Sequence, residues 1–176
     1  MSGTVIWFTG LSGAGKSTIA ELVGRDLEAR GDLVDYLDGD VVRDHLSRGL
    51  GFSKADRDTN IERIGWVASR IARTGATVIV SAISPYAATR ASARAMVEDA
   101  GARFVEVHVA TSLDECARRD VKGLYEKAFG GELKEFTGVS DPYEEPASPE
   151  LRLETEGRSP QAAAVDVLEY LSGVPA

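Results

Sequence analysis

The segment GLSGAGKS, residues 10–17, carries the side chains best suited to chemistry in this chain. It has the pattern G-x-x-x-x-G-K-[ST]. The glycines let backbone N–H groups surround a phosphate, and a helix that follows adds its positive N-terminal dipole. Lys16 would then reach the β- and γ-phosphates, and the Ser17 hydroxyl would hold Mg²⁺. The pattern therefore predicts a site for a nucleoside triphosphate with Mg²⁺, although it does not say which reaction follows.

A second group of candidate residues is the LDGD segment, which contains Asp38 and Asp40. It comes at the end of a predicted strand, and ligands of open α/β sheets bind beyond the carboxyl ends of their strands. A carboxylate there can hold Mg²⁺ through water or accept a proton from an attacking hydroxyl. The alternative for Asp38 is an ordinary turn aspartate before glycine. Arg43 either faces the same site from a short helix or is a solvated charge.

The segment LGFSKADRDTNIERIG, residues 50–65, places polar side chains where a helix normally carries its apolar stripe. At about 100° per residue, Arg57 falls on the inward face defined by the isoleucines of this helix, with Asn60 beside it. A buried, unpaired guanidinium is too costly to persist. Two interpretations remain open. Arg57 pairs with one of the LDGD aspartates, or Arg57 and Asn60 bind an anionic ligand while Phe52 stacks on a base.

Composition narrows the class of protein. At 176 residues we expect one domain, 1–176, and a net charge of −8 argues against nucleic-acid binding. No apolar run approaches the ~20 residues that span a bilayer, and the N-terminal residues lack the features of a signal peptide. The single cysteine, Cys116, excludes an internal disulfide framework. A cytoplasmic protein without membrane or nucleic-acid partners is expected.

The elements that must position these residues alternate between strands and helices. Strands are predicted at 4–9, 33–37, 76–82, 103–110 and 151–154. Helices are predicted at 16–30, 40–47, 53–74, 85–100, 112–120 and 159–171. This alternation indicates a three-layer α/β fold of the P-loop NTPase type, a parallel sheet flanked by helices. Residues 121–149 show only fragments of helix and are interpreted as a lid.

Guanine-nucleotide switches need D-x-x-G after a strand and later [NT]-K-x-D. This chain has partial matches, DVKG at 120–123 and SKAD at 53–56, but in the reverse order and without a preceding strand. A small-molecule kinase with a lid that excludes water is therefore favoured.

Six motifs in order carry a resemblance to a known family: GLSGAGKST, LDGDVVR, LGFSKADRDTNIERI, ISPY, RDVKGLYEKA and EFTGVSDPYEEP. Over nearly the whole chain the sequence resembles adenylylsulfate kinases. The resemblance implies transfer of the γ-phosphoryl group of MgATP to the 3′-hydroxyl of adenosine 5′-phosphosulfate (APS), which gives PAPS and ADP in sulfate assimilation. A kinase for another nucleoside 5′-derivative and a non-catalytic regulatory module are the alternatives. The intact phosphate-loop motif argues against the second.

The pattern and the resemblance together give the candidate residues. For phosphoryl transfer they are Lys16, Asp38, Asp40, Ser84 and Lys122. For ATP they are Gly10, Ser12, Gly13, Ala14, Gly15, Lys16, Ser17, Thr18 and Arg119, and for Mg²⁺ they are Ser17 and Asp38. For APS they are Asp38, Arg43, Phe52, Arg57, Asn60, Ile83, Ser84, Lys122, Lys127, Phe136 and Thr137.

The resemblance implies that two phenylalanines, Phe52 and Phe136, sandwich the adenine of APS. The alternative for Phe136 is a lid residue that fills the core, for Lys122 a solvated charge, and for Ser84 either a phosphorylated or, as we favour, a ligand-lining serine. The lid departs from the family pattern because Phe129 and Gly130 replace an Arg-Ala pair.

Trp66 lies on the outward face of its predicted helix. An exposed tryptophan is informative about interfaces, so we expect it in a homodimer contact. An ATP sulfurylase is a second possible partner.

Overall fold

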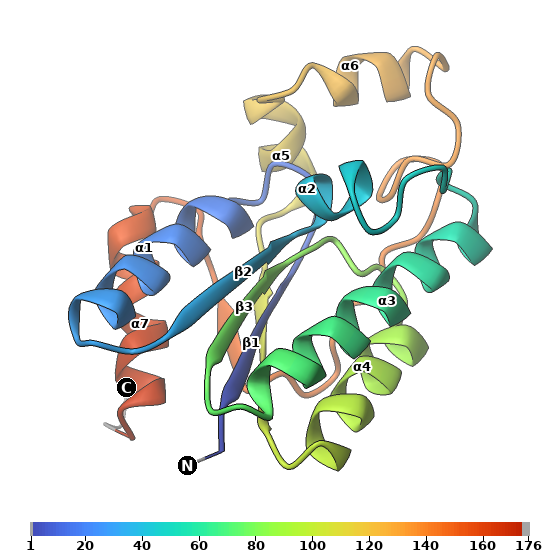
Figure 1. Ribbon diagram of the computed structural model, residues 1–176. Coiled ribbons are helices and arrows are strands. Elements are labelled where there is room, and N and C mark those ends of the chain that lie inside the picture. The colour runs from blue at the N-terminus through green and yellow to red at the C-terminus, as the bar shows by residue number, and fades with distance from the viewer. Residues whose placement is uncertain (1, 174–176) are drawn as a thin grey trace.

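Five parallel strands form one sheet in the order β2-β3-β1-β4-β5 (Figure 1). The computed structural model describes residues 2–173. The strands are β1 (Thr4–Thr9), β2 (Val34–Asp38), β3 (Thr77–Ser81), β4 (Arg103–Val109) and β5 (Leu151–Leu153). The helices are α1 (Lys16–Ala29), α2 (Gly39–Asp44), α3 (Lys54–Ala72), α4 (Ala87–Asp99), α5 (Leu113–Arg119), α6 (Leu124–Phe129) and α7 (Pro160–Leu171). The predicted fold class is confirmed.

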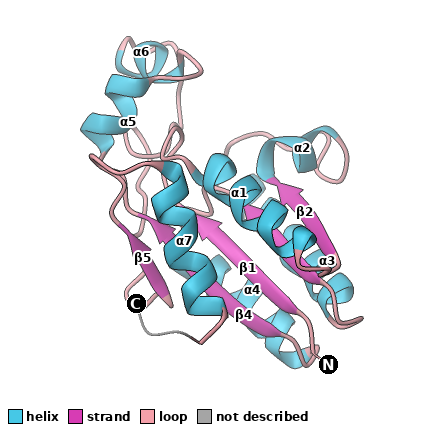
Figure 2. Cartoon of the chain, turned by 90° about the vertical axis from the view of Figure 1, so that its left-hand side faces the viewer, coloured by secondary structure: helices cyan, strands magenta, loops and turns pink. Residues whose placement is uncertain are grey.

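The central strand β1 shows why three layers form. Its side chains alternate between the two faces of the sheet, as the period of two in a strand requires. Ile6 and Phe8 pack in one core with α1 and α7, whereas Val5 and Trp7 pack in a second core with α3 and α4. All four side chains are fully buried. The two helix pairs therefore cover opposite faces of the sheet, and Figure 2 shows α7 lying across one of them.

Several element boundaries differ from the sequence prediction, and two of them lie close to the site. Strand β2 extends to Asp38, whose side chain accepts a hydrogen bond from the Asp40 N–H and so caps α2. Helix α4 begins at Ala87 rather than at Pro85, and the Ala87 N–H donates to the Glu144 carboxylate (2.7 Å) from the end of the lid. The lid itself contains one ordered helix, α6, whose first N–H groups are capped by the Asp120 side chain.

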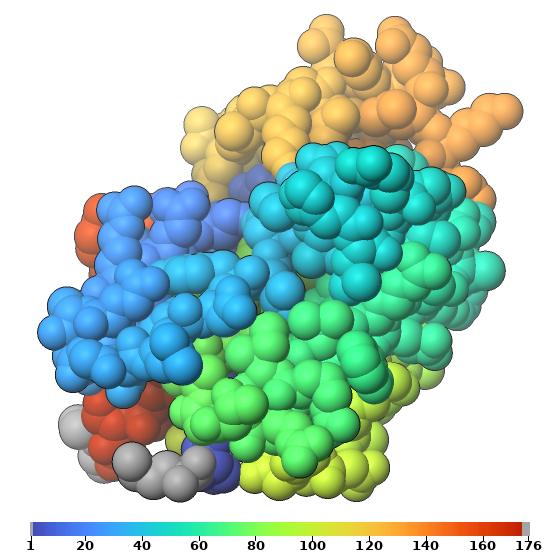
Figure 3. Space-filling model, viewed as in Figure 1, coloured from blue at the N-terminus to red at the C-terminus, as the bar shows by residue number. Residues whose placement is uncertain are grey.

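The lid crosses the carboxyl ends of β1, β2 and β3. Helices α5 and α6 project above the sheet in Figure 1, and the lid residues (yellow to orange) rest over α2 and the segment that follows it (cyan) in Figure 3. This is the edge at which open α/β sheets bind ligands. Within residues 2–173, no helix combines the length and the apolar character that crossing a membrane requires.

Candidate active site

A cavity of about 430 Å³ lies beneath the lid, at the edge of the sheet. The cavity is lined by residues of the phosphate loop, the LDGD segment, the start of α3, the loop after β3 and the lid. The predicted residues that line it are Ser12, Gly13, Gly15, Lys16, Ser17, Thr18, Asp38, Asp40, Arg43, Phe52, Arg57, Asn60, Ile83, Ser84, Lys122, Phe136 and Thr137. The predicted residues outside its wall are Gly10, Ala14, Arg119 and Lys127.

The phosphate loop connects β1 to α1, as the motif requires. Gly15 precedes the helix with φ 103°, a left-handed conformation that a residue with a side chain rarely adopts. The Lys16 ammonium is buried and donates to the Leu11 carbonyl oxygen (2.8 Å). Burial lowers the pKa of Lys16 to about 8. The loop therefore offers a cation next to backbone N–H groups at a helix N-terminus, which is an arrangement suited to phosphate.

Oxygen atoms suited to a hard cation gather beside this loop. The Ser17 hydroxyl donates to Asp38 Oδ2 (2.8 Å) and lies 3.1 Å from the Ser81 hydroxyl. Mg²⁺ prefers such oxygens and commonly takes only one or two protein carboxylates, with substrate phosphates and water completing its shell. In residues 2–173 there is no cluster of three or more His, Cys, Asp or Glu side chains that could hold a metal ion alone. The residues present fit a Mg²⁺ ion that arrives with a triphosphate.

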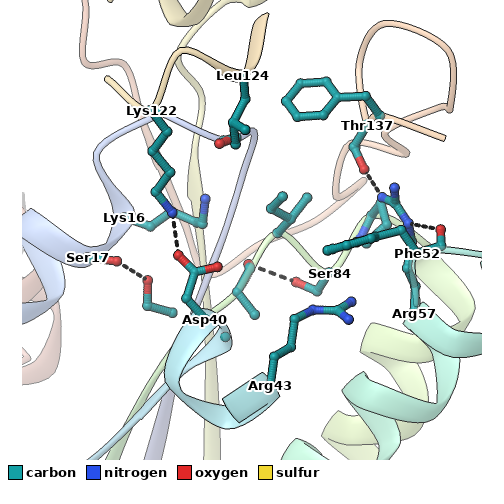
Figure 4. Close-up of a pocket in the computed structure, with 18 of the residues that line it drawn as sticks. Lys16, Ser17, Asp40, Arg43, Phe52, Arg57, Ser84, Lys122, Leu124 and Thr137 are labelled. Atoms are coloured by element: carbon teal, nitrogen blue, oxygen red, sulfur yellow. Dashed lines mark hydrogen bonds and ion pairs between the residues drawn. The ribbon is translucent and has the colours of Figure 1, made fainter. Parts of the chain in front are cut away.

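An ion pair links the lid to the acceptor side of the cavity. Lys122, just after α5, donates to the Asp40 carboxylate at the start of α2 (Figure 4). Both side chains are more than half exposed, so the pair contributes little to stability. What the contact does establish is that the lid lysine reaches the mouth of the cavity between the phosphate loop and α2.

Arg57 is buried, as its position on the helix predicts, and its partners come from the lid and from Phe52 rather than from an LDGD aspartate. Its guanidinium donates to the Phe52 carbonyl oxygen (2.7 Å), and also to the Thr137 hydroxyl and the Glu135 carbonyl oxygen of the lid (Figure 4). The Asp141 carboxylate lies 3.6 Å away.

The interpretation in which Arg57 pairs with Asp38 or Asp40 is therefore wrong. The returning lid supplies the acceptors instead, and it brings them next to the start of α3. Asn60, one turn along the helix, is buried, and its side-chain oxygen has no hydrogen-bond partner among the described residues.

The two predicted stacking residues occupy different environments. The Phe52 ring is 58% exposed, and the Arg43 guanidinium lies over it at 4.4 Å from the ring centroid. Phe136 packs partly into the core, edge-on to Tyr125 with ring centroids 5.1 Å apart. Phe136 thus fills the core beneath the lid, as one of the two interpretations holds, and also lines the cavity. Both aromatic side chains border the same cavity.

Ser84 has a backbone conformation that its residue type does not predict. Its φ is 43°, in the left-handed region, and its buried hydroxyl accepts a hydrogen bond from the Trp7 indole N–H (3.0 Å). Arg119, at the end of α5, donates to the Glu115 carboxylate (2.8 Å).

Sequence reasoning missed Ser81 and Tyr125, both of which line the cavity. The Tyr125 hydroxyl donates to the Ser12 carbonyl oxygen (2.7 Å) and so ties α6 to the phosphate loop. For Ser81 the available signal was its place at the end of a strand.

Comparison with known proteins decides the family. Residues 2–154 match the family model for adenylylsulphate kinase. The chain belongs to the adenylylsulphate kinase family. It is 53% identical over 170 residues to the adenylyl-sulfate kinase of Deinococcus deserti, a match that covers 97% of this chain and 92% of that protein. It is also 53% identical over 171 residues to a probable bifunctional SAT/APS kinase 2 of Sorangium cellulosum, of which it spans 29%.

The solved structure of the Mycobacterium tuberculosis APS kinase CysC, in complex with AMPPNP and APS, superposes with a TM-score of 0.94. The two chains are 48% identical, and the match covers 97% of this chain and 98% of that one. This adenylylsulphate kinase family member is therefore a P-loop kinase that uses ATP.

Proposed function

We propose that this chain transfers the γ-phosphoryl group of ATP to the 3′-hydroxyl of APS, giving PAPS and ADP. In this step the bond from the γ-phosphorus to the β,γ-bridging oxygen breaks, a bond from phosphorus to the 3′-oxygen forms, and the hydroxyl loses its proton. The observation that carries the proposal is one cavity bordered by both a complete phosphate loop and a polar and aromatic acceptor wall, in a fold that a relative with bound AMPPNP and APS shares.

On the nucleotide side, we assign Lys16 and the N–H groups of the phosphate loop to the phosphates of ATP. Ser17 and Asp38 would hold Mg²⁺, which when bound neutralises charge on the phosphate oxygens. Asp38 also lies where it can orient the acceptor hydroxyl and accept its proton, since it ends β2 at the cavity wall. Lys122 supplies a further positive charge from the lid.

On the acceptor side, Phe52 and Phe136 are the aromatic surfaces for the adenine of APS. Arg43 and Arg57 provide positive charge for the phosphosulfate group, and the partnerless oxygen of Asn60 supports a polar contact with the ligand. Arg57 donates to two lid groups in this structure. To contact APS, its guanidinium must either bind APS and these groups together or release them when APS binds.

A coupled assay of ADP release tests the proposal. The purified chain is supplied with MgATP and, in separate reactions, with APS, adenosine monophosphate or no acceptor. We expect ADP release that depends on APS. Equal release with APS and with water alone would refute the function, and faster release with another nucleotide would favour a kinase for a different acceptor.

The pKa of Lys16 predicts a pH dependence of ATP binding. With its pKa lowered to about 8 by burial, the ammonium is mostly charged at pH 7 and mostly neutral at pH 9. The phosphates bind the charged form, so we expect KM for ATP to rise by up to about tenfold between these pH values. Initial rates at a series of ATP concentrations measure the change. In the variant Lys16→Arg, whose guanidinium keeps its charge, the rise should disappear; an equal rise in the variant would assign it to another group.

The exposed Trp66 supports a homodimer. Its side chain on α3 is 59% exposed, which agrees with the outward position inferred from the sequence. If it is a central contact, Trp66→Ala should weaken self-association at least about tenfold. Sedimentation velocity over a range of concentrations measures this. Phe129→Ala, which removes an equally exposed aromatic ring from the lid, is the control. An unchanged sedimentation coefficient for Trp66→Ala would rule out this interface.

Three further expectations complete the proposal. We propose that residues 1–176 act as one kinase domain whose lid is formed by residues 121–149. We place the protein in the cytoplasm because its lone cysteine, Cys116, suits a reducing compartment. An ATP sulfurylase is the partner we propose, since that enzyme class makes APS and one relative is described as bifunctional.

A further inference from the structure

Arg90, on the first turn of α4, makes contacts that sequence reasoning did not anticipate. Its side chain is buried, and each nitrogen of its guanidinium has a different partner. The Nε donates to the Glu106 carboxylate of β4 (3.0 Å), one terminal nitrogen donates to the Ser84 carbonyl oxygen (2.7 Å), and the other donates to the Glu144 carbonyl oxygen (2.6 Å). One planar group therefore joins the sheet, the loop after β3 and the returning end of the lid.

Two of these partners belong to segments that matter for the acceptor site. Ser84 lines the cavity and holds a left-handed backbone conformation, which a serine adopts only when its surroundings impose it. Glu144 lies where the lid rejoins the domain. Its N–H donates to the Pro85 carbonyl oxygen (2.8 Å), and its carboxylate accepts from the Ala87 N–H (2.7 Å). The loop and the lid end are thus attached to each other, with Arg90 between them.

A second connection runs parallel to the first. The Thr9 hydroxyl, at the end of β1, lies 2.9 Å from the Tyr143 hydroxyl of the lid and donates to the Ile83 carbonyl oxygen (2.7 Å). The Arg90 guanidinium carbon lies 5.9 Å from the centroid of the Tyr143 ring. Through Thr9, these contacts give the lid end a second link to the same loop.

We propose that Arg90 is a positioning residue for the acceptor site: it fixes the loop at residues 83–85 and the returning end of the lid in one arrangement. The inference rests on the proposed function, because it assigns the loop and the lid to APS binding. Arg90 lies outside the cavity wall, so it acts through Ser84 and Glu144 and not through contact with the substrate. A lysine cannot replace it, because one ammonium does not reproduce the planar fork of three donor nitrogens.

The chain offers a matched control on the same helix. Arg94, one turn after Arg90, also lies near Glu106 (3.8 Å) and makes two hydrogen bonds with the Glu150 carboxylate (both 2.8 Å). It belongs to the same charge network, with two hydrogen bonds where Arg90 makes three, and its side chain is 27% exposed against 4% for Arg90. Its partners, including Glu98 (3.5 Å), lie outside the cavity wall. Arg90→Lys and Arg94→Lys therefore each keep the charge and remove one guanidinium fork, and only the first disconnects the loop and the lid.

Steady-state kinetics and limited proteolysis of both variants test the proposal. For Arg90→Lys we expect KM for APS to rise about tenfold, the scale of one lost charge-assisted hydrogen bond, while KM for ATP changes less than twofold. Trypsin should also cleave the lid after Lys134 about tenfold faster, because the lid end opens more often. Arg94→Lys should leave both quantities near wild type. The melting temperature of each variant shows whether it is folded at the temperature of these assays.

The outcomes separate the inference from the proposed function. A selective rise in KM for APS with faster lid cleavage supports the positioning role. A fall in kcat alone, with both KM values unchanged and lid cleavage at the wild-type rate, would mean that Arg90 fixes neither the APS site nor the lid, and it overturns the inference. Equal behaviour of the Arg90 and Arg94 variants overturns it too. If the wild-type chain shows no APS-dependent ADP release, the proposed function fails, and the proteolysis comparison alone then decides whether Arg90 holds the lid.

Discussion

Replacing Lys16 with methionine is expected to lower kcat at least about a hundredfold, the scale seen when one group that stabilises transition-state charge is removed. The Lys16 ammonium is buried at the start of α1, where the phosphates of ATP are proposed to bind. Methionine has a similar length and no charge, so it removes the interaction with little change in shape. Steady-state rates of ADP release at saturating MgATP and APS measure the effect.

We do not expect Lys16→Met to unfold the protein. Burial already disfavours the charged form of Lys16, which is why its pKa is lowered to about 8. A methionine relieves this desolvation, and the Leu11 carbonyl oxygen keeps its hydrogen bond from the Ala14 N–H (3.2 Å), so we expect a melting temperature close to that of the wild type. Lys54→Met is the control, because Lys54 is exposed and pairs with Asp58 (2.6 Å) away from the phosphate loop. A Lys16→Met enzyme with kcat within tenfold of wild type would exclude a catalytic role for this lysine.

The parts of the site that the sequence predicts well are those that depend on neighbours along the chain. The phosphate loop is local: its strand, its glycines and its helix follow one another, and Gly15 adopts the left-handed conformation that its residue type permits. The inward face of α3 is equally local, because it follows from helical periodicity alone. The burial of Arg57 and Asn60 is predictable for this reason, since it depends only on their positions along one helix.

Partners that come from distant segments were not predictable in the same way. Arg57 binds the carbonyl oxygen of Glu135, which lies 78 positions away. Every residue carries a backbone carbonyl, so this acceptor leaves no mark in the sequence. An aspartate in LDGD was one of the two interpretations, because charge is visible in the sequence and lid geometry is not. Arg90 was missed for a related reason: an arginine near the start of a helix looks solvated until its two carbonyl acceptors are in place.

The resemblance to a family supplied what neither periodicity nor charge did. Lys122 and Asp40 are 82 positions apart, and no local pattern brings them together, yet they form an ion pair across the mouth of the cavity. The end of a predicted strand already placed Asp40 in the site, whereas only the family motif RDVKGLYEKA placed Lys122 there. The same reasoning included Lys127, which is exposed and outside the cavity wall, so its role in phosphate binding stays a prediction.

Replacing Asp38 with asparagine is expected to lower kcat by about 10²- to 10³-fold, within the range of a lost proton acceptor. The two carboxylate oxygens of Asp38 have different hydrogen-bond partners in the structure. Its Oδ1 accepts from the Asp40 N–H (2.9 Å) and caps α2, whereas its Oδ2 accepts from the Ser17 hydroxyl (2.8 Å) at the proposed Mg²⁺ position. Asparagine keeps a cap oxygen and loses the negative charge, so activity should fall while α2 remains capped.

Asp40→Asn is the matched comparison, since it removes the other LDGD charge two residues away. The Asp40 side chain is 74% exposed and pairs with Lys122, so its loss should lower kcat less than tenfold. Asp38→Ala adds a third measurement, because it removes the cap as well and should destabilise the fold by about 1 kcal/mol relative to Asp38→Asn. If Asp40→Asn proves the more damaging change, the proton acceptor is the exposed carboxylate beside the lid lysine. The ion pair would then break each time the acceptor hydroxyl enters, which makes lid movement part of the chemical step.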